Sequence, residues 1–267
     1  MKKFIVILVL GLLFTACEEE KEKELVFENY SVERSFNDCN PETDSACTYI
    51  RLSYPLVVSE DDKGKNINRK IEQHVIQIVD YQESDSIKTA EAMAEAFIKD
   101  YSDTAEEFAE YELPWEASVY GDLMLKTVNL ISVRFDSEVF SGGAHGYSSV
   151  TFMNINPQTG KLYSEDELFK PGFKDFAEKQ FREDQQISAD ESINSTGMFF
   201  EDDQFQLPQN IGFSNNKVIL HYNPYEIASY AQGSFRMEFS YDEIQKYLKI
   251  DLQPEGEKEL QALLQNP

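Results

Sequence analysis

Two side chains stand out for the chemistry that they could support. His145 lies in a glycine-rich loop with Gly142 and Gly143, whose backbones can adopt conformations that other residues resist. This loop either presents His145 to a ligand or is a structural turn that His145 braces by hydrogen bonding. Glu226 follows Tyr225 in an aromatic and apolar setting. Burial would raise the pKa of its carboxyl group and suit it to acid/base chemistry, whereas pairing with a cation or a backbone amide would make it structural.

The other polar residues match no familiar catalytic or metal-binding pattern. His74, His145 and His221 are far apart, and none has a second His or Cys at ligand spacing, which argues against zinc. Acidic runs at residues 61–62 and 201–203 could offer oxygen atoms to calcium, but neither has the spacing of an EF-hand loop. The chain also has no Gly-x-Ser-x-Gly elbow and no phosphate-binding glycine loop. We therefore expect no catalytic residue, metal or cofactor.

Cys17 is the cysteine with the clearest predicted role. It ends an N-terminal segment in which Lys2 and Lys3 precede an apolar run that is too short to span a membrane. Residues 13–17, Leu-Phe-Thr-Ala-Cys, resemble the lipobox of bacterial lipoproteins. From this resemblance we expect cleavage before Cys17 and lipidation of that residue. Two or more acyl chains on Cys17 would anchor the protein stably.

Residues 18–24 are all glutamate or lysine, which is typical of a solvated tether. An acidic run after a lipidated cysteine also resembles a signal for display on the cell surface. We therefore expect a lipid-anchored envelope protein in the outer membrane, with the acidic run acting either as a plain tether or as a signal for surface display. Removal of Lys2 and Lys3 with residues 1–16 would leave 22 basic and 49 acidic residues, a net charge of −27. This charge excludes nucleic acid as a partner and favours a cationic one, although acidity also keeps exported proteins soluble.

The remaining cysteines, Cys39 and Cys47, flank a turn-rich segment. An even pair in an oxidising compartment predicts a disulfide that closes a hairpin loop.

Periodicity predicts strands grouped with helices, which is typical of an α+β fold with antiparallel sheets and packed helices. The expected helices cover residues 67–80, 87–111, 173–185 and 241–248. The expected strands cover residues 25–36, 48–54, two or three segments of 115–140, and 147–155, 205–213, 217–222 and 235–239.

Two motifs resemble a known family. Residues 141–146 (Ser-Gly-Gly-Ala-His-Gly), followed by Thr159-Gly160-Lys161 and 166–169 (Asp-Glu-Leu-Phe), are similar to the hallmark of the DUF3298 domain. Residues 225–233 are similar to a second segment of that domain, with Ser229 where proline is common. Residues 25–140 resemble its usual companion, DUF4163, so the resemblance implies a PdaC/RsiV-like fold.

The resemblance implies an extracellular module, because relatives use the domain to bind lysozyme or carry it in front of a peptidoglycan deacetylase. We expect a binding module for a cationic, lysozyme-like protein or a cell-wall glycan. An enzyme acting on envelope polysaccharide and an envelope-assembly factor are the alternatives. Gly142, Gly143, His145, Tyr225 and Glu226 are the candidate ligand contacts or structural braces. The expected parts are a signal peptide (1–16), a tether (17–24), two subdomains (25–140 and 141–253) and a tail (254–267).

Overall fold

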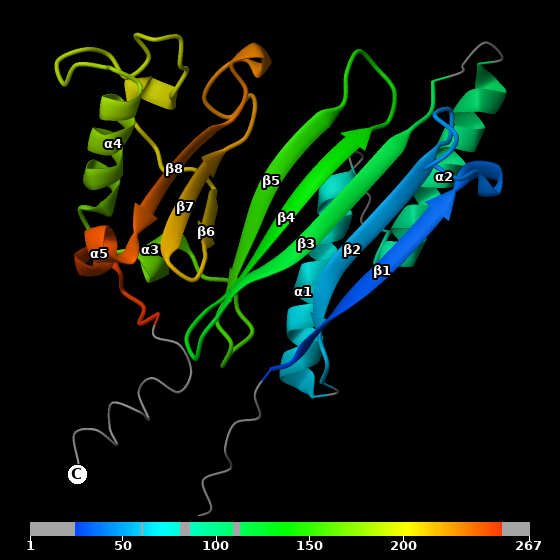
Figure 1. The fold of residues 1–267 in the computed structure, drawn as a ribbon, viewed down its shortest axis with the longest axis horizontal. Helices are drawn as coiled ribbons and strands as arrows, with labels where there is room; N and C mark the ends of the chain where they lie inside the picture. The colour runs from blue at the N-terminus through cyan, green and yellow to red at the C-terminus, as the bar shows by residue number, and fades with distance from the viewer. Residues whose placement is uncertain (1–24, 60, 81–85, 109–112, 253–267) are drawn as a thin grey trace, which may run out of the picture.

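The computed structural model describes residues 25–59, 61–80, 86–108 and 113–252. It contains two β-sheets with helices packed on their outer sides (Figure 1). The first sheet contains β1 (Phe27–Ser35), β2 (Tyr49–Val57), β3 (Glu116–Lys126), β4 (Ile131–Phe140) and β5 (Tyr147–Ile155). The second contains β6 (Asn210–Phe213), β7 (Lys217–Tyr222) and β8 (Phe235–Ser240). The α-helices are α1 (Asp62–Val79), α2 (Ala90–Glu107), α3 (Glu165–Leu168), α4 (Phe173–Asp184) and α5 (Tyr241–Ile244).

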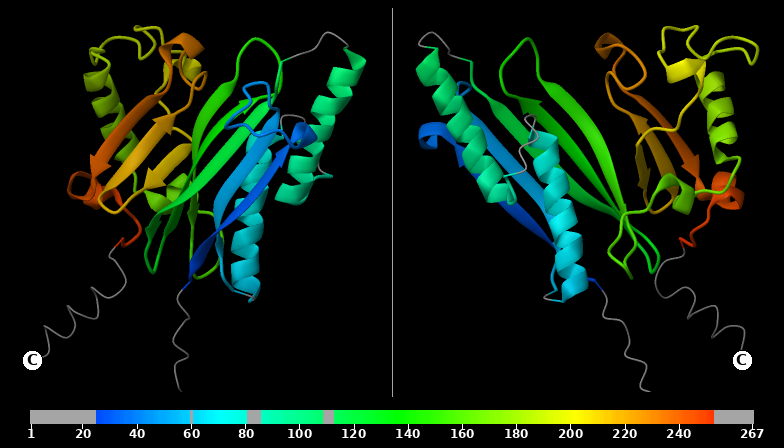
Figure 2. Two further views of the ribbon diagram at one scale, coloured as in Figure 1. Left: turned by 45° about the vertical axis from the view of Figure 1, so that its right-hand side comes forward. Right: turned by 180° about the vertical axis from the view of Figure 1, so that it is seen from behind.

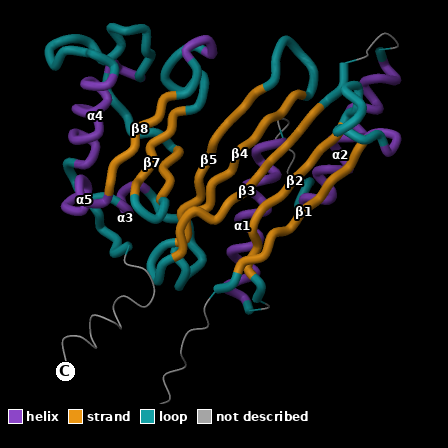
Figure 3. The backbone as a smooth tube through the Cα atoms, in the orientation of Figure 1, coloured by secondary structure: helices purple, strands orange, loops and turns teal. Residues whose placement is uncertain are grey.

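The five strands of the first sheet lie in chain order, and all neighbours pair antiparallel except β2 and β3. That pair is parallel because α1 and α2 intervene and return the chain to the end where β2 began, as parallel neighbours require. The sheet is therefore mixed, with an antiparallel majority. Seen from behind, α1 and α2 lie across one face of this sheet (Figure 2), and the tube drawing shows the other face without helices (Figure 3).

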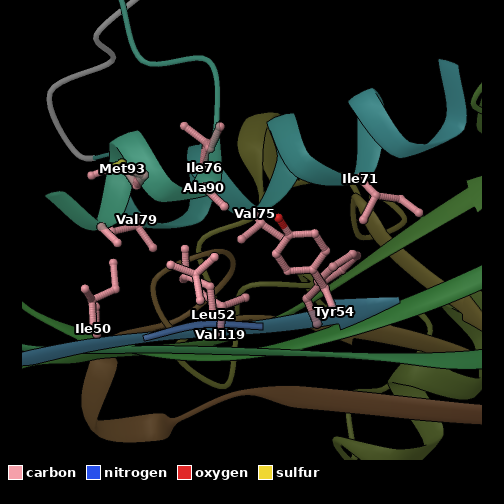
Figure 4. Close-up of a cluster of buried hydrophobic side chains, with 14 of the residues drawn as sticks. Ile50, Leu52, Tyr54, Ile71, Val75, Ile76, Val79, Ala90, Met93 and Val119 are labelled. Carbon is pink, nitrogen blue, oxygen red and sulfur yellow. The ribbon is translucent and has the colours of Figure 1, made fainter. Parts of the chain in front are cut away.

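Buried and exposed side chains alternate along the strands, so each strand contributes buried residues to the face that carries the helices. Ile50, Leu52 and Tyr54 of β2 are fully buried beneath the helices, while the residues between them are partly exposed. Ile71 and Val75 of α1 point down onto this layer (Figure 4). Both helices begin at side-chain caps: Asp61 accepts a hydrogen bond from the Gly64 amide at 2.7 Å, and Thr89 accepts one from the Ala92 amide at 3.2 Å. The acid at residue 61, considered for calcium, is thus a helix cap.

The second sheet packs on α4 around its own aromatic core. Phe173 and Phe181 of α4 are buried against this sheet and its connecting loops, and Phe173 lies edge-on to Phe239 of β8 at 6.2 Å. The expected strand at residues 205–213 is shorter in the structure, where β6 begins at Asn210. Pro208 accounts for this difference, because proline has no amide hydrogen to donate to a sheet.

β6 crosses the helix-free face of the first sheet. The Asn154 side chain donates to the Ile211 carbonyl at 2.6 Å, and the Phe213 amide donates to the Ser132 hydroxyl at 3.0 Å. Gly212 lies directly over the Phe152 ring, so that a Cβ atom there would lie 2.3 Å from the ring. A glycine is therefore required for the two sheets to approach this closely.

Other expectations from the sequence have mixed outcomes. The hairpin of β1 and β2 and its disulfide are present, with the Cα atoms of Cys39 and Cys47 5.6 Å apart. The boundary expected at residue 141 falls between β4 and β5, which pair with each other in the first sheet. The signal peptide, Cys17, the tether and the tail lie outside the described residues. No helix among the residues described has both the length and the apolar character needed to cross a membrane.

Candidate functional site

The two segments singled out by the sequence motifs meet in the structure. The loop at residues 141–146 joins β4 to β5, and the segment at 223–234 joins β7 to β8. The Tyr230 hydroxyl donates to the Gly146 carbonyl at 3.4 Å, and the Tyr147 hydroxyl donates to the Pro224 carbonyl at 3.3 Å. The rings of His145 and Tyr230 stack with their centroids 4.5 Å apart. The candidate residues therefore gather at one end of both sheets.

Asn223 fastens this junction from within. Its side-chain oxygen accepts from the Val150 amide at 2.8 Å, and its side-chain nitrogen donates to the Val150 carbonyl at 3.0 Å. These two bonds pair Asn223 with the backbone of Val150 as a neighbouring strand would. Because Asn223 is buried, water does not replace them. The position of the 223–234 segment over β5 depends on this pair of bonds.

Glu226 supports the turn that follows Asn223. Its carboxylate accepts from the Asn223 amide at 2.9 Å and from the Gln209 amide at 3.4 Å. Burial raises the pKa of Glu226, and these amide hydrogen bonds oppose that rise. In the described chain its contacts are with the backbone and with Asn210, not with His145. This arrangement agrees with the structural alternative, in which Glu226 braces a turn.

Of the other candidate residues, Gly143, His145 and Tyr225 are exposed and Gly142 is partly buried. Gly142 and Gly143 have φ values of 92° and 93°, the left-handed region that favours glycine. Tyr225 also has a positive φ, 70°, and its ring lies 5.4 Å from that of Tyr230. His145 hydrogen-bonds through Nδ1 to the carbonyl of the next residue, at 2.8 Å. Whether these side chains contact a ligand stays a prediction.

Beside this cluster, a groove runs over the helix-free face of the first sheet. We call it the sheet groove. It has two connected parts of about 460 and 280 Å³ that share Tyr49, Ser118, Glu138 and Ser148. Residues of β3, β4 and β5 form its floor, and His221 with the 223–234 segment forms its wall. The further lining residues are Glu116, Tyr120, Asp136, Ser137, Val139, Phe140, Gly146, Tyr147, Ser149, Val150, Asn223, Pro224, Tyr230 and Ser234.

Strand register explains how the floor is assembled. Ser118 of β3 lies opposite Glu138 of β4, which lies opposite Ser148 of β5. In the next row Tyr120 lies opposite Asp136. Opposed residues in adjacent strands point to the same face, so these rows present hydroxyl, phenol and carboxylate groups side by side.

The groove is acidic. Glu116 and Glu138 are exposed, and neither has an ion-pair partner in the described chain. Arg51 lies across Ser118 from Glu138 in the register, but its guanidinium contacts Glu33 at 2.9 Å and Glu42 at 3.5 Å. His221 adds no charge at neutral pH, because burial and the nearby Arg236 lower its pKa.

The described residues contain no group of three or more His, Cys, Asp or Glu side chains placed to hold a metal ion. His74 does not line the groove. Its ring hydrogen-bonds to the Thr151 hydroxyl at 2.8 Å and packs on Phe135. In the acidic run at 201–203, Asp203 accepts from the Ser192 hydroxyl at 2.5 Å. A larger cavity of about 600 Å³ is lined by Leu125, Tyr241 and Leu252, among others, and contains none of the candidate residues.

The sequence motifs led to the rim of the groove and missed its floor. The signal was present in β3, where Glu116, Ser118 and Tyr120 alternate with buried Ala117 and Val119. Nothing in the sequence indicates that the wall residues His221, Asn223 and Ser234 face this floor, because their position follows from packing of the second sheet.

Comparisons with known proteins agree with this fold. Residues 166–242 match the family described as "Protein of unknown function (DUF3298)", and residues 41–148 match the family described as "Deacetylase PdaC". The DUF4163 companion expected for residues 25–140 stays a prediction. Among curated proteins, none matches this chain.

Two crystal structures share the fold. A DUF3298 family member from Bacteroides fragilis is 20% identical with a TM-score of 0.62, over 85% of this chain and 94% of that one. A DUF3298 family protein from Pseudomonas aeruginosa is 17% identical with a TM-score of 0.61, over 87% of this chain and 98% of that one. The α+β fold expected from the family resemblance is therefore confirmed.

Proposed function

We propose that this chain, which carries a PdaC-type segment at residues 41–148 and a DUF3298 segment at 166–242, is a binding module of the cell envelope. Its site is the sheet groove, and its ligand is a cell-wall glycan. The observation that carries this proposal is the lining of the groove, where tyrosines lie among serine hydroxyls and carboxylates.

Such a lining suits a sugar chain. Tyr120 and Tyr147 are 42% and 41% exposed, so their rings are available to the apolar faces of sugar rings, whereas the Tyr230 ring is stacked on His145. Serine hydroxyls both donate and accept hydrogen bonds, as sugar hydroxyls do. The two connected parts make the groove longer than one monosaccharide requires, and their volumes are in the range of small-ligand sites. The groove therefore fits a segment of a polymer.

The contacts of the groove favour binding over nucleophilic catalysis. In the described part of the chain, no serine of the groove hydrogen-bonds to His221, so no hydroxyl is paired with a base. Ser137 instead bonds to Ser149 at 2.7 Å. The carboxylate with a raised pKa, Glu226, is occupied by backbone amides and does not line the groove.

A cationic protein, of which lysozyme is an example, is the second candidate. The formal net charge of −25 favours it, as do the two carboxylates in the groove that have no ion-pair partner within the described part of the chain. Charge attraction alone would treat all basic proteins alike and would weaken as salt rises. A specific protein partner requires contacts that persist in high salt.

The test is isothermal titration of the full-length chain with oligomers of N-acetylglucosamine, with lysozyme and with a second basic protein of similar charge. We expect the oligomer to bind. Tyr120→Ala should lower the affinity for the oligomer about tenfold, because a stacked ring is lost. Phe108→Ala is the matched control, since Phe108 is 57% exposed at the end of α2, on the helix side of the sheet. Salt-resistant binding of lysozyme alone, without oligomer binding, would replace the glycan proposal with the protein one. Release of acetate from the oligomer would show that the chain is an enzyme.

A further inference from the structure

We propose that the sheet groove selects glycans whose amino sugars carry free amino groups over glycans in which those groups are acetylated. This inference rests on the proposed function and names the chemical class of its ligand. The geometry points to it because the groove holds two carboxylates, those of Glu116 and Glu138, that have no ion-pair partner among the residues that the structure describes.

The first step concerns the place of these carboxylates. Glu138 is on β4, in the floor of the groove, and Ser118 and Ser148 flank it on the adjacent strands. Glu116 lies two residues from Ser118 along β3, in the same row as Tyr49 of β2. Diagonal neighbours of this kind in an antiparallel pair are about 7–8 Å apart. The two carboxylates therefore flank one stretch of the floor rather than a single point.

The second step concerns the groups around them. The residues that line the groove include no lysine or arginine. Arg51, on the far side of Ser118, pairs with Glu33 and Glu42, and its guanidinium also donates to the Tyr120 hydroxyl at 3.5 Å. Asp136 differs from the two glutamates because Arg134 pairs with it. A positive charge brought by a ligand would therefore meet Glu138 and Glu116 without displacing any cation of the described residues.

The third step concerns the tyrosines. Tyr120 lies one row from Glu138 on the same face and is the ring that remains for a ligand. Tyr49 lies beside Glu116, but the Arg51 guanidinium is already 5.9 Å from the centroid of its ring. A cation over a tyrosine ring is attracted by the ring, and a nearby carboxylate adds charge-assisted hydrogen bonds. An ammonium group on a sugar ring would use both interactions, because the sugar can stack on tyrosine while its nitrogen reaches a carboxylate. An acetylated nitrogen carries no charge and would form neither interaction.

The experiment compares matched oligomers of glucosamine and of N-acetylglucosamine, of equal length, by isothermal titration of the full-length chain at physiological salt. Exposed ion pairs contribute modestly, so for two of them we expect the glucosamine oligomer to bind about fivefold to tenfold more tightly. The double substitution Glu116→Gln and Glu138→Gln keeps side-chain size and should bring the two affinities within about twofold, chiefly by weakening the glucosamine oligomer.

The control variant is Glu95→Gln, which removes one negative charge from the exposed surface of α2, on the other face of the sheet. It should leave the preference unchanged. Equal affinity of the wild-type chain for both oligomers would overturn this inference and leave the proposed function in place. A preference that Glu95→Gln reduces as much as the groove variants would also overturn it, because general charge attraction would then be the cause. Binding of neither oligomer would overturn the proposed function itself.

Discussion

Asn223→Ala should both destabilise the protein and disorganise the wall of the groove. The side chain of Asn223 is 7% exposed, and its bonds to the amide and carbonyl of Val150 are 2.8 and 3.0 Å long. Alanine would leave both backbone groups of Val150 without these partners. Each unsatisfied group costs roughly 1–3 kcal/mol, less where water from the groove can reach it. We expect the free energy of unfolding to fall by about 2–4 kcal/mol.

Urea denaturation followed by tyrosine and tryptophan fluorescence measures this change. Asn29→Ala is the matched control, because the Asn29 side chain donates to Ser53 at 2.8 Å on the exposed face of β1 and β2. It should change the free energy of unfolding by about 0.5 kcal/mol or less. If Asn223→Ala proves as mild as the control, the two bonds do not fasten the junction, and our account of the groove wall is wrong.

The remaining predictions concern the disulfide, one histidine and the anchor. Replacing Cys39 and Cys47 with serine should lower the free energy of unfolding by about 2–3 kcal/mol in the chain-entropy model, and reducing agent should then have no further effect on urea denaturation. Burial lowers the pKa of His74 from 6.5 to about 4, so its contribution to stability is fully present above pH 6.5 and is lost as pH falls toward 4. Between pH 7 and pH 4.5, the free energy of unfolding of His74→Gln should therefore fall by about 2 kcal/mol less than that of the wild-type chain. Equal falls for the two chains in urea denaturation would refute this. Cys17→Ser should abolish incorporation of labelled fatty acid into the chain, and retained label would rule out lipidation at that residue.

Much of the first layer of the fold could be predicted from periodicity. Ile67, Ile71 and Val75 recur at helical spacing and are all fully buried in α1. The β1–β2 hairpin could be predicted from alternation and from the two cysteines that close it. These features depend on residues that are close in the sequence, so the residue pattern is sufficient to predict them.

Several features that depend on packing between distant segments could not be predicted. The parallel pairing of β2 with β3 is set by where α1 and α2 return the chain. The short β6 depends on the approach of Gly212 to Phe152, which are far apart in the sequence. For the same reason the motifs identified the rim at His145 but not the wall at His221.

At Glu226 the family motif marks a residue that stabilises the fold. Glu226 was a candidate for acid/base chemistry, and the structure surrounds its carboxylate with backbone amides. Tyr230, which lies within the 225–233 motif but was not among the candidate residues, stacks on His145 and lines the groove. In the function that we propose, binding depends on the tyrosines, serines and glutamates of the sheet, whose residue types are too common to be noticed in isolation.

The most direct test of the central claim is a crystal structure of the protein grown with a glucosamine oligomer. Our account predicts sugar rings in the sheet groove, with one ring on Tyr120 or Tyr147 and a sugar nitrogen within hydrogen-bonding distance of Glu138. An oligomer bound at the cavity beside Tyr241, or at any other surface with the sheet groove empty, would contradict it.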